Sequence, residues 1–277
     1  MKIFYLFILM FQSLFSNKQE DRVENESVCV VFVCDENYFK KFQKTLSELR
    51  NEGKYSGDVV LIATGRLNQA YVKKRCRDKR LKITKFSPIS VPEGVKNVAL
   101  KPNGVTARMQ KFHVFQRFFK QWDYVFYIDV GMHIHRDISK MVDLCEKGTL
   151  LAHSNCYPTY IWDHSHEFID DNSLSYQHFI EEFGFTNDYF QSTMMLFDTK
   201  LIDGNTVQNL VDLLNKYPFG VGDQAYISLY FCHILPVWKQ IKINEGDQYF
   251  YDFHLRVKEK CIMHKYDNGP EKCIDCK

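Results

Sequence analysis

Residues 28–33 form an unbroken run of apolar, mostly β-branched side chains, and apolar residues at helical spacing follow at 38–49. A continuous apolar run is typical of a strand that is buried on both faces of a parallel sheet, because a strand with one face in water alternates apolar and polar residues. The same strand and helix patterns recur along the first half of the chain, at 59–63, 81–86, 109–119 and 122–128. This β-α-β alternation predicts an α/β fold with a doubly wound, mostly parallel sheet flanked by helices.

Length and charge limit what the chain can be. A chain of 277 residues that is 45% hydrophobic can bury one sizeable core, so residues 28–277 are expected to form a single domain. Its second half is predicted to add strands at 150–153 and 194–197 and a helix at 207–214. The formal net charge of +2 gives no basic field suited to nucleic acid, so we expect no nucleic-acid partner.

The first 27 residues have the pattern of a leader and a linker. Residues 1–16 combine a charged start with a short apolar centre, as in a secretory signal peptide, although Leu14 is a poor match to a cleavage site. If the segment is not cleaved, it is a signal anchor and the only expected membrane attachment. The polar linker 17–27 contains a glycosylation acceptor at Asn25. These features predict a secretory protein, either in the ER or Golgi lumen or secreted.

Nine cysteines fit an oxidising compartment. Cys261, Cys273 and Cys276 lie close together near the C-terminus, where disulfides are favoured over zinc because a zinc ribbon needs a second well-spaced pair. The odd count leaves at least one cysteine unpaired or intermolecular. Cys29 and Cys34 can serve as small hydrophobic residues within a strand.

The predicted strand 122–128 delivers one carboxylate, Asp129, and then a glycine, Gly131, at its C-terminal end. Open α/β sheets bind their ligands at this edge. A carboxylate there can hold a hard cation such as Mn²⁺ or Mg²⁺, while a nucleotide diphosphate completes the coordination shell. The alternative is an ordinary Asp-containing turn that binds nothing.

Six short segments, taken together and in order, resemble a known enzyme family. They lie at 34–38, 110–113, 127–131, 190–197, 222–224 and 261–264. Their order resembles that of the retaining glycosyltransferases of family 8, the glycogenin and bacterial lipopolysaccharide galactosyltransferase group, which have the GT-A fold. The resemblance runs from about Val28 to Lys272 and implies a nucleotide-sugar donor, UDP-linked in this family.

The resemblance assigns the first two segments to the donor nucleotide. Cys34 and Asp35 fall where the family begins to hold the uridine, and Tyr38 matches a tyrosine that stacks on the uracil. Lys111 matches a lysine that approaches the donor, and Arg108 lies one helical turn earlier, where it could also face the diphosphate. The alternatives are a core aromatic for Tyr38 and a solvated helix face for the two cations.

The third and last segments correspond to the metal and diphosphate site of the family. Asp129, Val130 and Gly131 match its Asp-X-Asp motif, but Gly131 replaces the second aspartate. Water, backbone or His133 could fill that ligand position. His264 matches the distant histidine ligand, and Lys272 matches a lysine that cradles the diphosphate, although it lies two residues later than expected.

The remaining segments are implied to face the transferred sugar. Gln191 and Asp223 would lie nearest the reacting carbon, and Gln224 would contact donor or acceptor. The alternative for Asp223 is a helix cap. We therefore expect a metal-dependent glycosyltransferase that moves a sugar to a hydroxyl of a glycan or protein, while the cation and Lys111 neutralise the leaving diphosphate.

Two hypotheses from other functional classes remain open. A non-catalytic glycan- or nucleotide-binding protein could keep the fold after losing the second aspartate. A nucleotidyltransferase would carry a glycine-rich phosphate loop after its first strand, and residues 34–39 contain no glycine.

Overall fold

The computed structural model describes residues 26–98, 102–155, 168, 173–184, 189–220, 222–245, 247–252 and 261–265. The predicted leader 1–16, most of the linker, the acceptor Asn25, and Lys272, Cys273 and Cys276 lie outside these residues. None of the helices in the described ranges has the length and apolar content needed to cross a bilayer.

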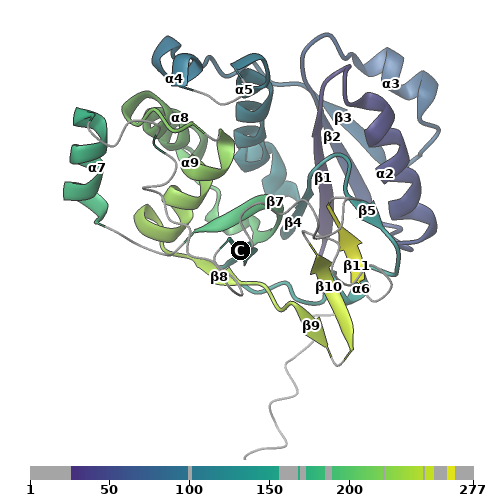
Figure 1. Cartoon of the computed structure of the whole chain (residues 1–277). Helices are drawn as coiled ribbons and strands as arrows, with labels where there is room; N and C mark the ends of the chain where they lie inside the picture. Colours follow the sequence, from purple (N-terminus) through teal and green to yellow (C-terminus); the bar gives the residue numbers. More distant parts are fainter. Residues whose placement is uncertain are drawn as a thin grey trace, which may run out of the picture.

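A seven-stranded sheet forms the centre of the protein (Figure 1), in the order β3-β2-β1-β4-β7-β6-β8. Its strands are β1 (Val28–Cys34), β2 (Asp58–Ala63), β3 (Leu81–Thr84), β4 (Tyr124–Ile128), β6 (Leu150–Ser154), β7 (Phe190–Asp198) and β8 (Trp238–Gln240). Only β7 runs against its neighbours in this sheet. The predicted doubly wound, mostly parallel sheet is therefore confirmed.

A smaller sheet packs beside the edge of the large one where β4 ends (Figure 1). It contains β5 (His133–Ile134), β9 (Asn244–Glu245), β10 (Gln248–Asp252) and β11 (Cys261–His264), in the order β5-β11-β10-β9. Because β5 follows β4 after a short turn and β11 lies near the end of the described chain, this sheet brings a late segment next to Asp129.

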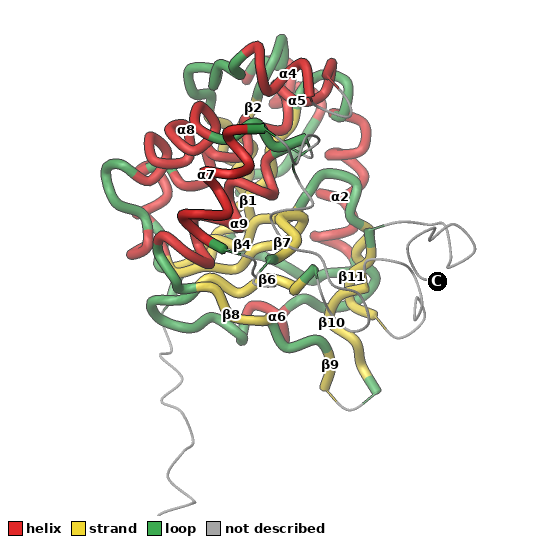
Figure 2. Tube along the Cα trace, turned by 60° about the vertical axis from the view of Figure 1, so that its left-hand side comes forward, coloured by secondary structure: helices red, strands yellow, loops and turns green. Residues whose placement is uncertain are grey.

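Helices cover both faces of the large sheet (Figure 2). They are α2 (Phe39–Asn51), α3 (Gln69–Arg75), α4 (Glu93–Val98), α5 (Pro102–Met109), α6 (Ser139–Val142), α7 (Leu174–Phe183), α8 (Thr206–Lys216) and α9 (Asp223–Leu229). Short helical turns are η1 (Gln110–Phe115), η2 (Arg117–Gln121), η4 (Thr199–Leu201) and η5 (Tyr230–Ile234).

Alternate residues of the central strands enter two separate hydrophobic clusters. In β4, Val125 and Tyr127 pack with α5, η1, α8 and α9, whereas Phe126 and Ile128 pack with α2 and the small sheet. Both faces of the strand are thus buried, which explains its continuous apolar sequence. Cys29 and Cys34 fill core positions in β1 as small side chains, as expected, and burial raises the pKa of both thiols.

The predicted helix at 109–119 is not one continuous helix. Helix α5 ends at Met109, and two 3₁₀ segments, η1 and η2, cover the following residues. The apolar spacing there is real, since Phe112, Phe115 and Phe119 are all buried. Packing of these large rings against the sheet therefore overrides regular α-helical geometry, and η1 holds Lys111 toward the sheet edge.

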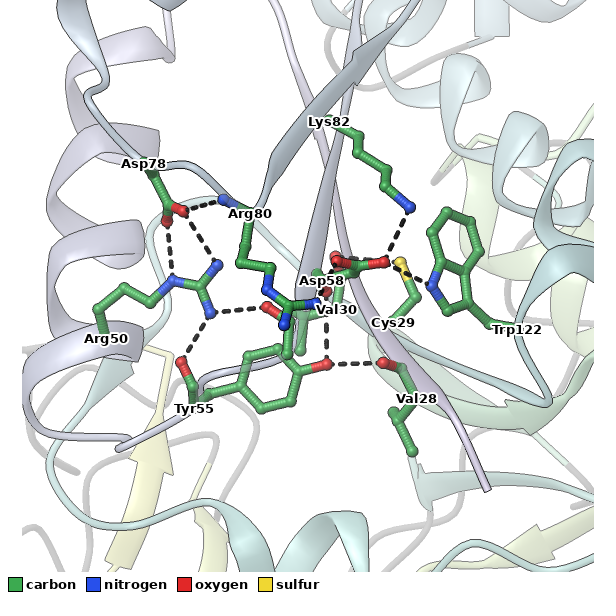
Figure 3. Close-up of polar contacts among 11 residues, drawn as sticks. Val28, Cys29, Val30, Arg50, Tyr55, Asp58, Asp78, Arg80, Lys82 and Trp122 are labelled. Atoms are coloured by element: carbon green, nitrogen blue, oxygen red, sulfur yellow. Dashed lines mark hydrogen bonds and ion pairs between the residues drawn. The ribbon is translucent and has the colours of Figure 1, made fainter. Parts of the chain in front are cut away.

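The starts of the parallel strands are tied together by a polar network (Figure 3). Arg50, in the last turn of α2, donates to Asp78 at 2.8 and 3.3 Å and to the carbonyl oxygens of Tyr55 and Gly57 at 2.6 and 2.9 Å. The Tyr55 hydroxyl donates to the carbonyl of Val28 at 2.7 Å. This network lies at the opposite end of the strands from Asp129, so it is structural.

Replacing Arg50 by methionine is expected to lower the free energy of unfolding by about 2 kcal/mol, because two carbonyls and a carboxylate lose a charged donor. Urea unfolding followed by circular dichroism measures this loss. The control is Lys44→Met, since Lys44 makes one exposed ion pair with Glu48 at 3.8 Å and should change stability by less than about 0.5 kcal/mol. Equal unfolding midpoints for the two variants would contradict the assignment.

Candidate active site

The carboxyl ends of β1 and β4 meet the amino end of β7 at one edge of the large sheet. Asp129 follows β4 directly, and its backbone N–H donates to the carbonyl of Thr193 in β7 at 2.8 Å. The β4–β7 register ends with Ile128 opposite Met194, so residues 191–193 lie alongside Asp129. Two of the segments predicted from sequence, 127–131 and 190–197, are therefore neighbours.

Lys111 joins these segments to the start of α9. Its Nζ lies 3.2 Å from Asp129 Oδ1 and 2.6 Å from Asp223 Oδ2. It also donates to the carbonyl and hydroxyl oxygens of Ser192, at 3.1 and 3.0 Å. Because only 9% of the side chain is exposed, this ammonium group is buried between two carboxylates.

Electrostatics keep this group charged. Burial by itself lowers the pKa of Lys111, but the carboxylates of Asp129 and Asp223 more than offset it, so the pKa is raised. A buried ammonium at the ligand-binding edge of the sheet is suited to holding an anion or stabilising developing negative charge.

Lys111, Asp129, Ser192 and Asp223 form one polar cluster, and Asp223 does not cap its helix. The N-cap residue of α9 is Gly222, which has no side chain, and Asp223 lies in the first turn of the helix. Its carboxylate accepts from the Ser192 hydroxyl at 2.7 Å as well as from Lys111. Gln224 accepts from the Ser192 backbone N–H at 3.2 Å. The helix-cap alternative for Asp223 is therefore wrong.

A second lysine, which the sequence did not identify, binds the other oxygen of Asp129. Lys265 Nζ lies 2.9 Å from Asp129 Oδ2, while the Tyr127 hydroxyl donates to Oδ1. Burial raises the pKa of Asp129, but Lys111 and Lys265 outweigh burial and hold it well below its usual range. Burial, reinforced by Asp129, raises the pKa of Tyr127, so its hydroxyl remains a donor. The sequence feature that could have identified Lys265 is its position directly after His264, the predicted metal ligand.

The predicted metal ligands are placed as follows. His264 is buried, and its Nδ1 lies 2.6 Å from Nε2 of His135, with the two rings stacked at 4.7 Å. His133 lies opposite His264 across β5 and β11, and its Nδ1 is 3.5 Å from Glu48. Within the described ranges, no group of three or more His, Cys, Asp or Glu side chains is arranged to hold a metal ion.

Gly131 adopts a backbone conformation that favours glycine. Its φ of +92° is one that residues with a side chain rarely adopt, and its N–H donates to the hydroxyl of Thr45 at 3.2 Å. The preceding Val130 packs partly buried against the hydrophobic cluster that contains α2. The turn after Asp129 contains no second acid. The residues that the structure describes around it do not fit a divalent cation, since the Asp129 carboxylate already binds the ammonium groups of Lys111 and Lys265.

The segment after β1 leaves one aromatic ring exposed. Asp35 accepts from the backbone N–H groups of Asn37 and Tyr38, each at 3.0 Å, and so orders the turn into α2. Tyr38 is 50% exposed, so the core-packing alternative is wrong and a ligand can reach its ring. The side chain of Cys34 is buried, and its Sγ lies 3.0 Å from the Asp35 carbonyl, so only its backbone is available to a ligand.

Gln191 and Arg108 flank the cluster. Gln191 is 2% exposed and accepts from the Tyr251 hydroxyl at 3.4 Å, while Tyr251 also bonds Thr193 at 2.9 Å. Tyr251 belongs to β10, so the small sheet orders this wall of the site. The Arg108 guanidinium packs against Gly222, where an added Cβ would lie 3.2 Å from its Nη1. Arg108 therefore lies beside the segment that leads into Asp223.

No protein-family model and no curated protein matches the chain. Solved structures do match. The apo structure of the bifunctional glycosyltransferase WbbM has a TM-score of 0.57 and 16% identity, and the match covers 90% of this chain and 48% of that one. The galactosyltransferase LgtC, in complex with donor and acceptor sugar analogs, gives a TM-score of 0.55 and 12% identity over 87% of both chains.

The glycosyltransferase GlyE of Streptococcus pneumoniae gives a TM-score of 0.50 and 15% identity, over 79% of this chain and 46% of that one. The chain thus spans about half the length of the WbbM and GlyE chains but most of the LgtC chain. At these identities the comparisons establish the fold. The chain has the GT-A-type fold of these glycosyltransferases, as the resemblance of its motifs predicts.

Proposed function

We propose that the chain is a glycosyltransferase that moves a sugar from a nucleotide-diphosphate donor, UDP-linked by resemblance, to a hydroxyl group of a glycan or protein. The observation that carries the proposal is the buried Lys111, held between Asp129 and Asp223 at the carboxyl edge of the sheet. An ammonium group in this position matches the charge of a departing diphosphate, and the GT-A-type fold supports a nucleotide-sugar site there.

The proposed reaction exchanges one bond to the anomeric carbon for another. The acceptor hydroxyl oxygen forms a bond to that carbon, and the bond to the diphosphate oxygen breaks with its electron pair remaining on the diphosphate. The hydroxyl proton passes to a phosphate oxygen of the leaving group. Lys111 stabilises the charge that grows on that group, and we propose, from the resemblance, that Gln191 and Asp223 lie nearest the reacting carbon. Retention of anomeric configuration is part of the proposal on resemblance alone.

Donor recognition is proposed to use the residues around β1. Tyr38 is exposed and can stack on a planar base, and Asp35 orders the turn that presents it. Arg108, Gln224 and the backbone at Cys34 and Val130 complete the contacts that we propose for donor and acceptor. The contact of Lys272 with the diphosphate and the secretory location stay predictions from the sequence. The predicted metal role of His264 is not part of this proposal, because Asp129 is bound by Lys111 and Lys265.

Hydrolysis of the donor tests this proposal without knowledge of the acceptor, because water can replace the acceptor hydroxyl. The purified protein is incubated with a panel of UDP-sugars and released UDP is measured. Wild type is expected to release UDP from at least one donor, and Asp223→Asn is expected to be at least about 100-fold slower, since it disturbs Lys111 and the acid beside the reacting carbon. Asp212→Asn, on the exposed face of α8, is the matched control and should retain wild-type activity.

The same assay separates the main alternative. A non-catalytic binding protein would bind UDP in a calorimetric titration but release none from any donor in the panel. Gly131, which stands in place of the second aspartate, is the observation that keeps this alternative open. Absence of both UDP binding and UDP release would remove the nucleotide-sugar proposal altogether.

A further inference from the structure

The strand pairing of the small sheet sets the position of Lys265. It follows β11 directly, where His264 pairs with His133 of β5 and Met263 pairs with Ile134. Strand β11 also pairs with β10. Because strands on both sides hold β11, the ammonium group of Lys265 is delivered to the carboxyl edge of the large sheet, 2.9 Å from Asp129 Oδ2.

Contacts with Thr193, Tyr127 and Lys111 fix the position of Asp129. Its N–H donates to Thr193 O at 2.8 Å, and its Oδ1 accepts from Tyr127 and contacts Lys111 at 3.2 Å. Oδ2 faces Lys265. The Lys265 and Asp129 side chains are 14% and 21% exposed, so this pair is more open to an incoming ligand than buried Lys111.

The charges around Asp129 favour an anion over a further cation. Two ammonium groups, Lys111 and Lys265, contact this carboxylate, and the other acid in contact with Lys111 is Asp223. A divalent ion bound to Asp129 would lie against both ammonium groups, and Gly131 supplies no second carboxylate. A diphosphate would instead gain a favourable contact with the partly exposed Lys265.

We infer that the ammonium group of Lys265, oriented by Asp129, supplies the positive charge that a divalent cation would otherwise provide, so that the donor diphosphate binds and departs without metal. Lys265 contacts the diphosphate, and Asp129 is a positioning residue for Lys265. This inference rests on the proposed function, because it assigns a second group, in addition to Lys111, that stabilises the leaving diphosphate of the same reaction.

Calorimetric titration of UDP into the full chain tests the inference, once in EDTA and once with Mn²⁺. Wild-type Kd is expected to be the same in both buffers. Lys265→Gln is expected to raise Kd in EDTA at least about ten-fold, since a charge-assisted hydrogen bond to phosphate is lost, and Lys265→Arg should restore most of the affinity. Lys140→Gln is the matched control, because Lys140 makes an exposed ion pair with Glu245 at 3.1 Å. Thermal melting confirms that each variant is folded.

The inference is overturned if EDTA weakens UDP binding to wild type about ten-fold or more, or if Lys265→Gln binds UDP as wild type does. A second measurement does not depend on nucleotide: Mn²⁺ is titrated into the nucleotide-free protein and free Mn²⁺ is followed by electron paramagnetic resonance. Saturable binding that disappears in Asp129→Ala would overturn the inference even if UDP bound. Failure of wild type to bind UDP in either buffer overturns the proposed function and this inference with it.

Discussion

Lys111→Met is expected to reduce donor turnover at least about 1,000-fold, the largest effect of any single substitution that we predict. The ammonium group contacts Asp129, Asp223 and Ser192, so its removal deletes the buried charge that we propose to face the leaving group. It also leaves two carboxylates close together without their shared partner. The free energy of unfolding is therefore expected to fall by about 3–5 kcal/mol, as when one partner of a buried ion pair is deleted.

Donor hydrolysis and urea unfolding measure these two effects. The matched control is Lys120→Met, because Lys120 lies in η2 and donates to the carbonyl of Ile202 at 2.8 Å. That variant should keep wild-type turnover. Adding Asp223→Asn to Lys111→Met should recover part of the lost stability, since one uncompensated charge is removed, but none of the activity. Wild-type turnover in Lys111→Met would refute the role of Lys111 in the reaction.

Asp129→Asn is expected to reduce donor turnover at least about 100-fold, because the amide cannot hold the ammonium groups of Lys111 and Lys265 in place. Lys111 retains Asp223, so stability should fall less than in Lys111→Met, by about 2 kcal/mol at neutral pH. The measurement is again hydrolysis together with urea unfolding.

The stability difference between wild type and Asp129→Asn is expected to depend on pH. The pKa of Asp129 is lowered in the folded protein, so its contribution is fully present above the unfolded-state pKa of about 3.9. It is lost as pH falls from there through the lower folded-state pKa. Unfolding at a series of pH values from 7 downward should therefore show a constant difference that shrinks below about pH 4.

Asp123→Asn is the control at the other end of β4. Its pKa is also lowered, by the backbone and side chain of Ser27, but the carboxylate is far along the strand from the cluster. It should share an acid-dependent stability effect and keep wild-type turnover. If both aspartate variants lose turnover to the same extent, the loss reflects general destabilisation and the role of Asp129 at the site is wrong.

Local pattern was enough to locate the main elements. The apolar runs predicted β1, β2 and β4, and the helical spacing predicted α2 and α8, with errors of only a few residues at their ends. Local pattern failed at 109–119, because ring packing against the sheet selected 3₁₀ geometry over a continuous α-helix. Regular periodicity reports which face of an element is buried, but not which helical hydrogen bonds the packed backbone keeps.

Some residues of the candidate site were predicted from the sequence and others were not. Lys111, Asp129 and Asp223 were identified from sequence, because each lies in a short segment with a recognisable order of residues, and the fold brings them together. Ser192, Tyr127 and Tyr251 were missed as members, since a serine or tyrosine within an apolar strand carries no distinguishing signal. The exposure of the Tyr38 side chain in the structure shows that it is not a core aromatic. The helical spacing of the sequence alone could not decide this.

By itself the sequence determined the alternation of strands and helices, the edge at which ligand chemistry would lie, and one acid at that edge, because these depend on neighbours within a few residues. Tertiary structure decided the charge of the site. Lys265 and Asp129 are 136 residues apart, and only the pairing of β11 with β5 and β10 brings them into contact. Pairing between distant strands depends on the packing of the whole chain, so a local pattern cannot specify which cation faces Asp129.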